Sequence, residues 1–408
     1  MQARNHVVMD AADHDLLWVE DYLPPQRSLR IAVVTETWPP EINGVAITLS
    51  RLVRGLCQRN HEIQLIRPRQ SKHEQASSAG AMHELLLQGL PIPHYPQLKM
   101  GLPSKRALLR AWTLKRPDLV HIATEGPLGW SALQAARRLR LPVTSDFRTN
   151  FHTYSQHYGL AWLSKPIMAY LRKFHNHTAC TMVPTKLLQA DLSRQGFANL
   201  RVVARGVDTR LFSPAHRCDS LRAQWQADPD TLVLLSAGRL AAEKNLDLVI
   251  QAYHALQPST AKVRLVVAGD GPYLDEFKKR CPDAVFLGMC SHEVLARVYA
   301  NADLFLFPSL TETFGNVTLE ALASGTPVLA FDCAAASELV QTGHNGMLVQ
   351  GNRSEDYIAS ALEIAREPQR LMAMREATRH SVVALDWQQI VLQVEGIFLQ
   401  AIAKAPTA

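Results

Sequence analysis

The chain has 408 residues, of which 47% are hydrophobic and 20% charged, a composition typical of soluble globular proteins. This length exceeds what one ordinary core holds, so we expect two domains, and no apolar run approaches the roughly 20 residues that a membrane span needs. Charge divides unevenly: residues 1–207 hold 26 Lys and Arg against 14 Asp and Glu (+12), whereas residues 208–408 hold 17 against 23 (−6).

The N-terminal tail, residues 1–28, is polar and acidic apart from the short apolar patch Leu16–Val19. It lacks the basic start and apolar core of a signal peptide, so a cytoplasmic protein is expected. The six cysteines contain no C-x-x-C pair. We therefore expect reduced, structural thiols rather than disulfides or a zinc site.

Short apolar strands alternate with longer helical patterns, which predicts βαβ units and parallel sheets. The expected strands of the first half are 30–35, 62–66, 118–122, 142–145 and 179–183, and those of the second half are 231–236, 263–268, 284–287, 303–307, 327–331 and 347–349. Turn residues from Arg205 to Pro214 separate the halves. The fold class is thus α/β, with two Rossmann-like, doubly wound domains whose strand carboxyl ends face a shared cleft.

The domain boundaries follow from this pattern. After the tail, residues 29–207 form the first domain and residues 208–384 the second. Residues 385–408 contain an amphipathic helical pattern with no strand after it, so we expect this C-terminal helix to pack back on the first domain.

Cations in the first half are densest around Lys105, Arg106, Arg110, Lys115 and Arg116, interleaved with leucines and a tryptophan. This reads as a basic amphipathic helix that would suit an anionic membrane surface. An ordinary exposed helix that packs its apolar stripe on the sheet fits the same pattern, and the sequence does not separate the two.

Three strand ends of the second half carry glycines or cations. After residues 231–236 come Arg239 and Lys244, which can both reach a diphosphate. After residues 263–268 comes Gly269-Asp-Gly271, where glycine permits close backbone approach. After residues 284–287 comes Gly288-Met289, where backbone groups can contact a base.

The fourth strand end carries two glutamates eight residues apart. Glu312 lies in the loop after residues 303–307, and Glu320 lies inside the following helix. Backbone amides of Phe314, Gly315 and Asn316, at the helix start, favour an anion. This arrangement suits a sugar nucleotide. One carboxylate would bind sugar hydroxyls, the amides would bind the diphosphate, and the other carboxylate would bind ribose hydroxyls.

Together, Gly-Arg-Leu-x-x-Glu-Lys, Gly-Asp-Gly-Pro, Phe-x-Gly and Glu-x(7)-Glu resemble the motifs of the retaining glycosyltransferases of family 4, which have the GT-B fold. The resemblance covers nearly the whole chain after residue 28. It implies that Arg239 and Lys244 neutralise the leaving diphosphate, that Glu312 holds the donor sugar and that Glu320 holds the ribose. Positive charge placed where negative charge develops would then promote departure of the nucleotide.

The resemblance also implies roles in the first domain. Asn43-Gly44-Val45 matches a Gly-Gly-Val motif, so Gly44 would offer its amide to phosphate. The family's Phe-His-Thr, whose histidine contacts the donor sugar, aligns with Arg148 in the histidine position, while Phe151-His152-Thr153 repeats the motif four residues later. Either Arg148 substitutes or His152 enters the site, and we favour His152 with Arg148 close by.

The sequence thus predicts a retaining hexosyltransferase that needs neither cofactor nor metal. The metal-binding pattern D-x-D occurs only as Asp13-His-Asp15 and Asp228-Pro-Asp230, which fit turns and caps better. GDP-mannose is the favoured donor, because the segment 35–40 and Thr149-Asn-Phe151 resemble those of mannosyltransferases, and a UDP-hexose is second. The acceptor would be a hydroxyl compound, with a glycolipid suggested by the basic first half.

Two alternative functions fit parts of this pattern. A GT-B-like nucleotide-sugar epimerase would need acid and base carboxylates at the sugar, whereas the Glu312 motif resembles that of the transferases. A nucleic-acid-binding protein would fit the basic first half, but no stacking aromatic platform or nucleic-acid motif is present. The acceptor, the linkage and the oligomeric state do not follow from the sequence.

Overall fold

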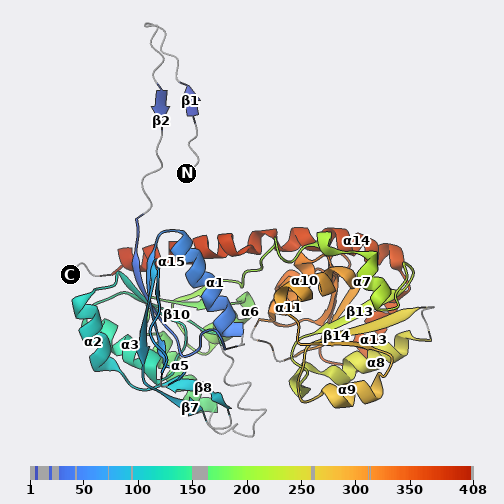
Figure 1. The fold of residues 1–408 in the computed structure, drawn as a ribbon, viewed down its shortest axis with the longest axis horizontal. Helices are drawn as coiled ribbons and strands as arrows, with labels where there is room; N and C mark the ends of the chain where they lie inside the picture. The colour runs from blue at the N-terminus through green and yellow to red at the C-terminus, as the bar shows by residue number, and fades with distance from the viewer. Residues whose placement is uncertain are drawn as a thin grey trace.

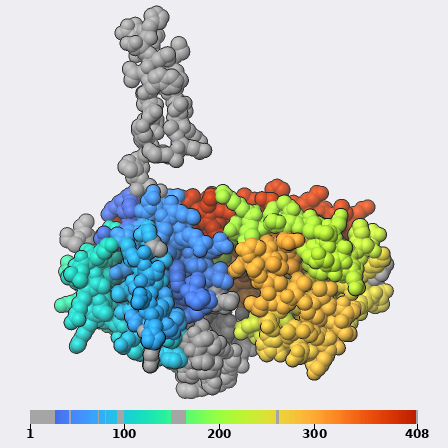
Figure 2. Space-filling view, in the orientation of Figure 1, coloured from blue at the N-terminus to red at the C-terminus, as the bar shows by residue number. Residues whose placement is uncertain are grey.

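The computed structural model describes residues 5–7, 18–20, 27–41, 44–71, 73–92, 95–148, 164–258, 262–310, 312 and 314–405. They form two α/β halves that lie side by side, with the C-terminal helical segment 368–403 running along one edge of both (Figures 1 and 2). Two short antiparallel pairs accompany the main sheets: β1 (Asn5–Val7) with β2 (Trp18–Glu20), and β7 (Gly89–Ile92) with β8 (Tyr95–Gly101). The predicted α/β class is confirmed.

The first half is built on an eight-stranded sheet whose neighbours run parallel, except for the edge pair β5–β6. In sheet order its strands are β12 (Leu200–Val202), β11 (Cys180–Val183), β10 (Val143–Asp146), β9 (Leu119–Ile122), β3 (Arg30–Val34), β4 (Glu62–Pro68), β6 (Met82–Leu87) and β5 (Ser78–Ala79). Its helices are α1 (Gly44–Gln58), α2 (Lys105–Leu114), α3 (Pro127–Arg138), α5 (Ser164–His175) and α6 (Lys186–Arg194).

The second half is built on a six-stranded parallel sheet. In sheet order its strands are β15 (Val285–Gly288), β14 (Val263–Ala268), β13 (Leu232–Ala237), β16 (Leu304–Phe307), β17 (Val328–Phe331) and β18 (Gly346–Val349). Its helices are η2 (Pro214–His216), α7 (Asp219–Gln224), η3 (Ala242–Lys244), α8 (Leu246–Leu256), α9 (Leu274–Arg280), α10 (His292–Asn301), α11 (Asn316–Ala323), α12 (Ala334–Leu339), α13 (Ser354–Ala365), α14 (Pro368–Thr378) and η4 (Arg379–Leu385).

Consecutive residues of a strand point to opposite faces of its sheet. In both sheets, the residues on each face are buried against helices. In β3, Ile31 and Val33 pack with α1 and the C-terminal helix α15 (Trp387–Ala403), whereas Ala32 and Val34 pack with α2 and α3. The second sheet does the same with two separate clusters. Continuous apolar strands of this kind are the pattern expected for buried parallel sheets.

The chain crosses between the halves twice, and the two crossings are bonded together. The amide of Val207 donates to the carbonyl of Leu385 (2.9 Å), and the hydroxyl of Thr209 donates to the carboxylate of Asp386 (2.7 Å). Asp386 also caps α15, accepting from the amide of Gln388 (2.9 Å). α15 then lies against α1, with contacts to β9 and β10.

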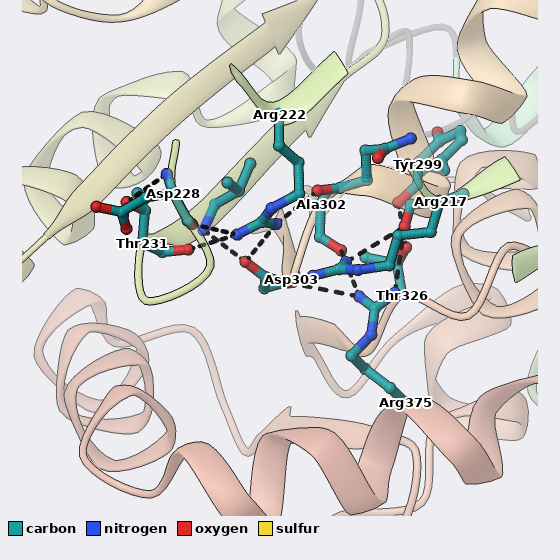
Figure 3. A network of polar contacts seen from close by, with 12 residues as sticks. Arg217, Arg222, Asp228, Thr231, Tyr299, Ala302, Asp303, Thr326 and Arg375 are labelled. Atoms are coloured by element: carbon teal, nitrogen blue, oxygen red, sulfur yellow. Dashed lines mark hydrogen bonds and ion pairs between the residues drawn. The ribbon is translucent and has the colours of Figure 1, made fainter. Parts of the chain in front are cut away.

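A buried charge network holds the second half together at the end opposite its strand carboxyl termini. Figure 3 shows three arginine side chains pointing toward Asp303, which immediately precedes β16. Arg217 and Arg222 contact its two carboxylate oxygens at 2.8 and 2.9 Å, and Arg375 of α14 approaches to 3.8 Å. Burial, and then the charge of Arg217, lowers the pKa of Arg375 to about 10. The network joins α7 and α14 to the base of the sheet.

Helix α2 packs its apolar stripe inward, with Leu108 and Trp112 fully buried. The indole of Trp112 donates to the side chain of Gln64 (3.0 Å). Beyond the helix end, Lys115 pairs with Glu62, and Arg116 donates to the carbonyl of Leu139 (2.8 Å). The cations that face solvent on the helix itself are therefore Lys105, Arg106 and Arg110.

None of the helices in the described ranges is long and apolar enough to cross a bilayer. All six cysteines are free.

Candidate active site

The four second-half motifs follow β13, β14, β15 and β16, which are neighbours in the sheet. Because these strands are parallel, their carboxyl ends meet at one edge. A hollow of about 260 Å³ opens there, lined by the end of β13, by Arg239 and Lys244, and by Phe307 and Pro308 at the end of β16. The structure thus brings together the two cations and the loop that carries Glu312.

Glu312 and Lys244 form an ion pair between Oε1 and Nζ, although 68 positions separate them in the chain. The same oxygen accepts a hydrogen bond of 2.9 Å from the hydroxyl of Ser309. Both side chains are mostly buried, with 25% of Lys244 and 14% of Glu312 exposed. The residues predicted to serve diphosphate and sugar therefore contact each other.

Arg239 is more exposed than Lys244 and pairs with Glu243. Its loop is held against the glycine turn after β14: the amide of Leu240 donates to the carbonyl of Asp270 (2.9 Å). A Cβ atom at Gly271 would lie 2.3 Å from the carbonyl oxygen of Leu240, and the φ of Gly271 is +155°. Gly271 is thus required for the close contact between the two loops that positions Arg239.

Met289 follows β15 at the same edge of the sheet. Its side chain is 65% exposed, which leaves it accessible to a ligand.

Two helix starts face each other across the halves. Helix α11 begins at Asn316, after Gly315 in the left-handed region (φ 92°), and Phe314 before it is buried. Helix α1 begins at Gly44, and a Cβ atom there would lie 3.9 Å from the side-chain nitrogen of Asn316. The positive ends of two helix dipoles therefore converge, an arrangement that favours a bound anion.

Glu320 lies one turn further along α11 and is half-buried. Burial raises the pKa of its carboxyl to about 7, against an opposing contribution from the nearby hydroxyl of Tyr299. Burial, and then the charge of Glu320, raises the pKa of Tyr299 well above its usual range. Glu320 is thus a carboxyl group that gains or loses its proton near neutral pH.

In the first half, Arg148 is 6% exposed and turned toward Asp146, to which it donates through Nε and Nη2. Burial acts to raise the pKa of Asp146, but the charge of Arg148 outweighs it and holds that pKa well below its usual range. His121 also contacts Asp146: its Nε2 lies 3.3 Å from the carboxylate, and its Nδ1 lies 3.1 Å from the Thr144 hydroxyl. Arg148 is thus a fixed cation.

Arg148 and Arg205 share a hollow of about 370 Å³ at the carboxyl ends of β10, β11 and β12. Burial, and then the nearby charge of Arg148, lowers the pKa of Arg205 to about 9. Thr48 also lines this hollow, one helical turn after Gly44. His152, the other candidate for the family's histidine position, lies outside the described residues, so the choice between Arg148 and His152 remains a prediction.

The sequence did not single out Glu36, which follows β3 on the first half's cleft edge. It accepts a hydrogen bond from the amide of Leu128 (3.1 Å) at the start of α3. A Cβ atom at Gly126 would lie 2.2 Å from its carboxylate. Burial raises the pKa of Glu36 to about 7, with the hydrogen bond from Leu128 opposing and the charge of Glu125 adding. Glu36 is therefore a second carboxyl group with a pKa near 7.

Comparisons with known proteins agree with the predicted family. Residues 219–381 match the family described as Glycosyl transferases group 1, and residues 42–211 match Glycosyltransferase Family 4. A GDP-mannose-dependent alpha-mannosyltransferase of Mycobacterium tuberculosis is 32% identical over 373 residues, covering 90% of this chain and 96% of that protein. An alpha-monoglucosyldiacylglycerol synthase of Streptococcus pneumoniae is 27% identical over 336 residues, covering 79% of this chain and 76% of that protein.

Among solved structures, sucrose-phosphate synthase from Thermosynechococcus elongatus superposes with a TM-score of 0.75 at 20% identity, covering 92% of this chain and 100% of that one. This likeness confirms the predicted two-domain GT-B fold. The alternative of an epimerase is not supported, because both matching families consist of transferases.

Proposed function

This chain belongs to the glycosyltransferases of group 1 and family 4, and we propose that it transfers mannose from GDP-mannose to a hydroxyl group of a glycolipid. That it is a hexosyltransferase follows from the family and its relatives; the donor and the acceptor are the proposal. The observation that carries it is the convergence of Arg239, Lys244 and Glu312 at one sheet edge, opposite Gly44.

The donor would lie across this edge. Its diphosphate would occupy the space between the starts of α1 and α11, within reach of Arg239 and Lys244. Its sugar would bind Glu312, and its ribose hydroxyls would donate to Glu320. The name of the mycobacterial relative supports guanosine as the nucleoside and mannose as the sugar, and a UDP-hexose is the second candidate.

We propose a retaining reaction. The bond between the sugar C1 and the β-phosphate oxygen breaks first, and its electron pair passes to the phosphate. The acceptor hydroxyl then forms a bond to C1 on the same face, and its proton passes to a phosphate oxygen. Arg239 and Lys244 stabilise the charge that grows on the phosphate, which is where fixed cations lower a barrier. No metal is required in this scheme.

The acceptor would meet the first half. The streptococcal relative is named for a diacylglycerol product, and the exposed cations Lys105, Arg106 and Arg110 would attract anionic lipid headgroups. We therefore propose that the protein works at a membrane surface while remaining peripheral to it.

A donor screen tests the function. Thermal shift should show stabilisation by GDP-mannose above that by UDP-glucose, since a ligand stabilises the fold it binds. Incubation with GDP-mannose should then release GDP slowly by hydrolysis and faster with lipid acceptors, with the product in the α configuration by NMR. EDTA should leave the rate unchanged. A β product would refute retention, and loss of activity in EDTA that manganese restores would refute the metal-free scheme.

A further inference from the structure

Both cations assigned to the diphosphate are paired with carboxylates of the chain itself. Lys244 pairs with Glu312, and Arg239 pairs with Glu243. The two pairs differ in burial: 25% of Lys244 and 14% of Glu312 are exposed, against 53% of Arg239 and 27% of Glu243. Ion pairs that are shielded from water hold more strongly than exposed ones. The pair that matters for ligand binding is therefore Lys244–Glu312.

This pair joins the residue assigned to the sugar with a residue assigned to the diphosphate. A bound sugar nucleotide offers each of them a substitute, because its hydroxyls donate to Glu312 and its phosphate accepts from Lys244. A nucleoside diphosphate without sugar offers a substitute only to Lys244. Among the described residues, Glu312 would then lose its cation and keep the hydrogen bond from Ser309 (2.9 Å), in a largely buried position.

Leaving a buried carboxylate without its partner has a cost, and that cost weakens binding of the bare diphosphate. Resting on the function proposed above, we propose that Glu312 makes the donor site selective for the sugar nucleotide over the spent nucleoside diphosphate, by competing for Lys244 whenever no sugar is bound. Selectivity here is a difference between two affinities, created by a penalty against one ligand.

The consequence appears after transfer. Once the sugar has left, Glu312 recovers Lys244, the grip on the diphosphate weakens and the product departs. The same contact therefore serves donor choice at the start of the cycle and product release at its end.

Calorimetric titration of GDP and GDP-mannose tests this, with wild type, Glu312→Gln and Glu243→Gln. Glutamine keeps the size of residue 312 but releases Lys244. Glu312→Gln should bind GDP about two- to fivefold tighter, a range set by the small free energies of partly exposed ion pairs. It should bind GDP-mannose no tighter than wild type does. Stopped-flow displacement should show slower GDP release.

Glu243→Gln is the matched control, because it releases the other, more exposed cation. It should shift GDP and GDP-mannose affinity together, by less than about twofold. In a Lys244→Ala background, the gain in GDP affinity from Glu312→Gln should disappear, as expected for two groups that act through each other.

The proposal is overturned if wild type binds both ligands but Glu312→Gln binds GDP no tighter than wild type. It is also overturned if the gain persists without Lys244. Failure of the proposed function looks different: wild type would then bind neither GDP nor GDP-mannose.

Discussion

Glu320 should make nucleotide binding depend on pH. Its pKa is raised to about 7 by burial, despite an opposing contribution from the nearby Tyr299 hydroxyl. In the proposed arrangement, ribose hydroxyls donate to the ionised carboxylate, so binding would favour loss of the proton. We expect GDP affinity to rise several-fold from pH 6 to pH 8, with a proton released on binding near pH 6.5, measured by calorimetry in buffers of different ionisation enthalpy.

The terminal phosphate of GDP titrates in the same range, so Glu320→Gln is the control that removes only the carboxyl contribution. Glu36→Gln, which changes the other carboxyl group with a pKa near 7, should keep the dependence. A pH profile identical in wild type and Glu320→Gln would exclude Glu320 from nucleotide binding.

The same shift has a consequence for stability. The pKa of this carboxyl is about 7 in the folded protein, against an ordinary value of 4.5 for the unfolded chain. Between pH 4.5 and 7, the folded protein therefore binds more protons than the unfolded chain does. The free energy of unfolding therefore falls as pH rises from about 4.5 to 7 and is level above. Glu320→Gln should stabilise the ligand-free protein more at pH 8 than at pH 5, as melting temperatures would show. Equal stabilisation at both values would contradict the raised pKa.

Arg239 and Lys244 should matter more for turnover than for donor affinity, because negative charge grows on the leaving phosphate only as the bond breaks. Removing one preorganised donor of this kind typically lowers kcat about 10²- to 10³-fold. Arg239→Ala and Lys244→Ala should each show a loss of this order in kcat, with a much smaller change in the Kd of GDP-mannose. A loss confined to affinity would assign them to binding alone.

The meeting of the candidate donor-site residues at one sheet edge could be predicted, because their motifs are local, whereas their roles stay predictions. Arg239, Lys244, Glu312 and Glu320 each follow a strand whose apolar run and glycine turn are visible in the sequence, and parallel strands bring those ends together. Their mutual contacts could not be predicted. Nothing in the sequence near Lys244 shows that Glu312 will neutralise it, since that pairing depends on the three-dimensional packing of two loops.

At the scale of elements, α15 is fixed to the first half by a buried histidine. The Nδ1 atom of His61 accepts from the amide of Leu29 (3.1 Å), so its proton lies on Nε2, which donates to Glu395 of α15 (2.7 Å). Arg59 adds a second contact to the same carboxylate (2.7 Å). Glu395→Ala would leave a buried donor unsatisfied, and we expect a loss of about 1–3 kcal/mol, measured by thermal or urea unfolding.

Glu363→Ala is the comparison for this prediction. Glu363 also pairs with an arginine, but its side chain is 51% exposed. Its removal should change stability by less than about 0.5 kcal/mol. If both variants lost the same small amount, the contact between α15 and His61 would contribute little to holding the helix.

The strands of the second half were predicted to within one residue at each end, because each is a continuous apolar run bounded by turn residues. In the first half, β5, β6, β7, β8 and β12 were not predicted. Every residue of β6 is only half-buried, β7 contains a proline and β12 has three residues at the sheet edge. Such strands carry weak apolar patterns, and their place is set by the neighbours they pair with.

At the scale of the whole molecule, charge separates the two halves. The excess of +12 in residues 1–207 and of −6 in the remainder would orient the protein with its first half toward an anionic surface. The exposed cations of α2 lie on this half, and Leu114, at the end of the same helix, is 89% exposed. Of the two alternatives for this helix, its apolar stripe follows the second and is buried in the core, so attraction would be mainly electrostatic.

Binding to anionic liposomes should therefore depend steeply on salt. Each cation near such a surface contributes about 1 kcal/mol, and exposed charges are screened over roughly 10 Å at 0.1 M salt. Charge reversal of Lys105, Arg106 and Arg110 should abolish sedimentation with liposomes and leave donor hydrolysis unchanged. Reversal of Lys262, Lys278 and Lys279, exposed cations of the second half, changes the net charge equally and should leave binding largely intact. If both triple variants lost binding alike, net charge rather than α2 would direct the protein to the membrane. Absence of wild-type binding at low salt would favour an acceptor dissolved in water.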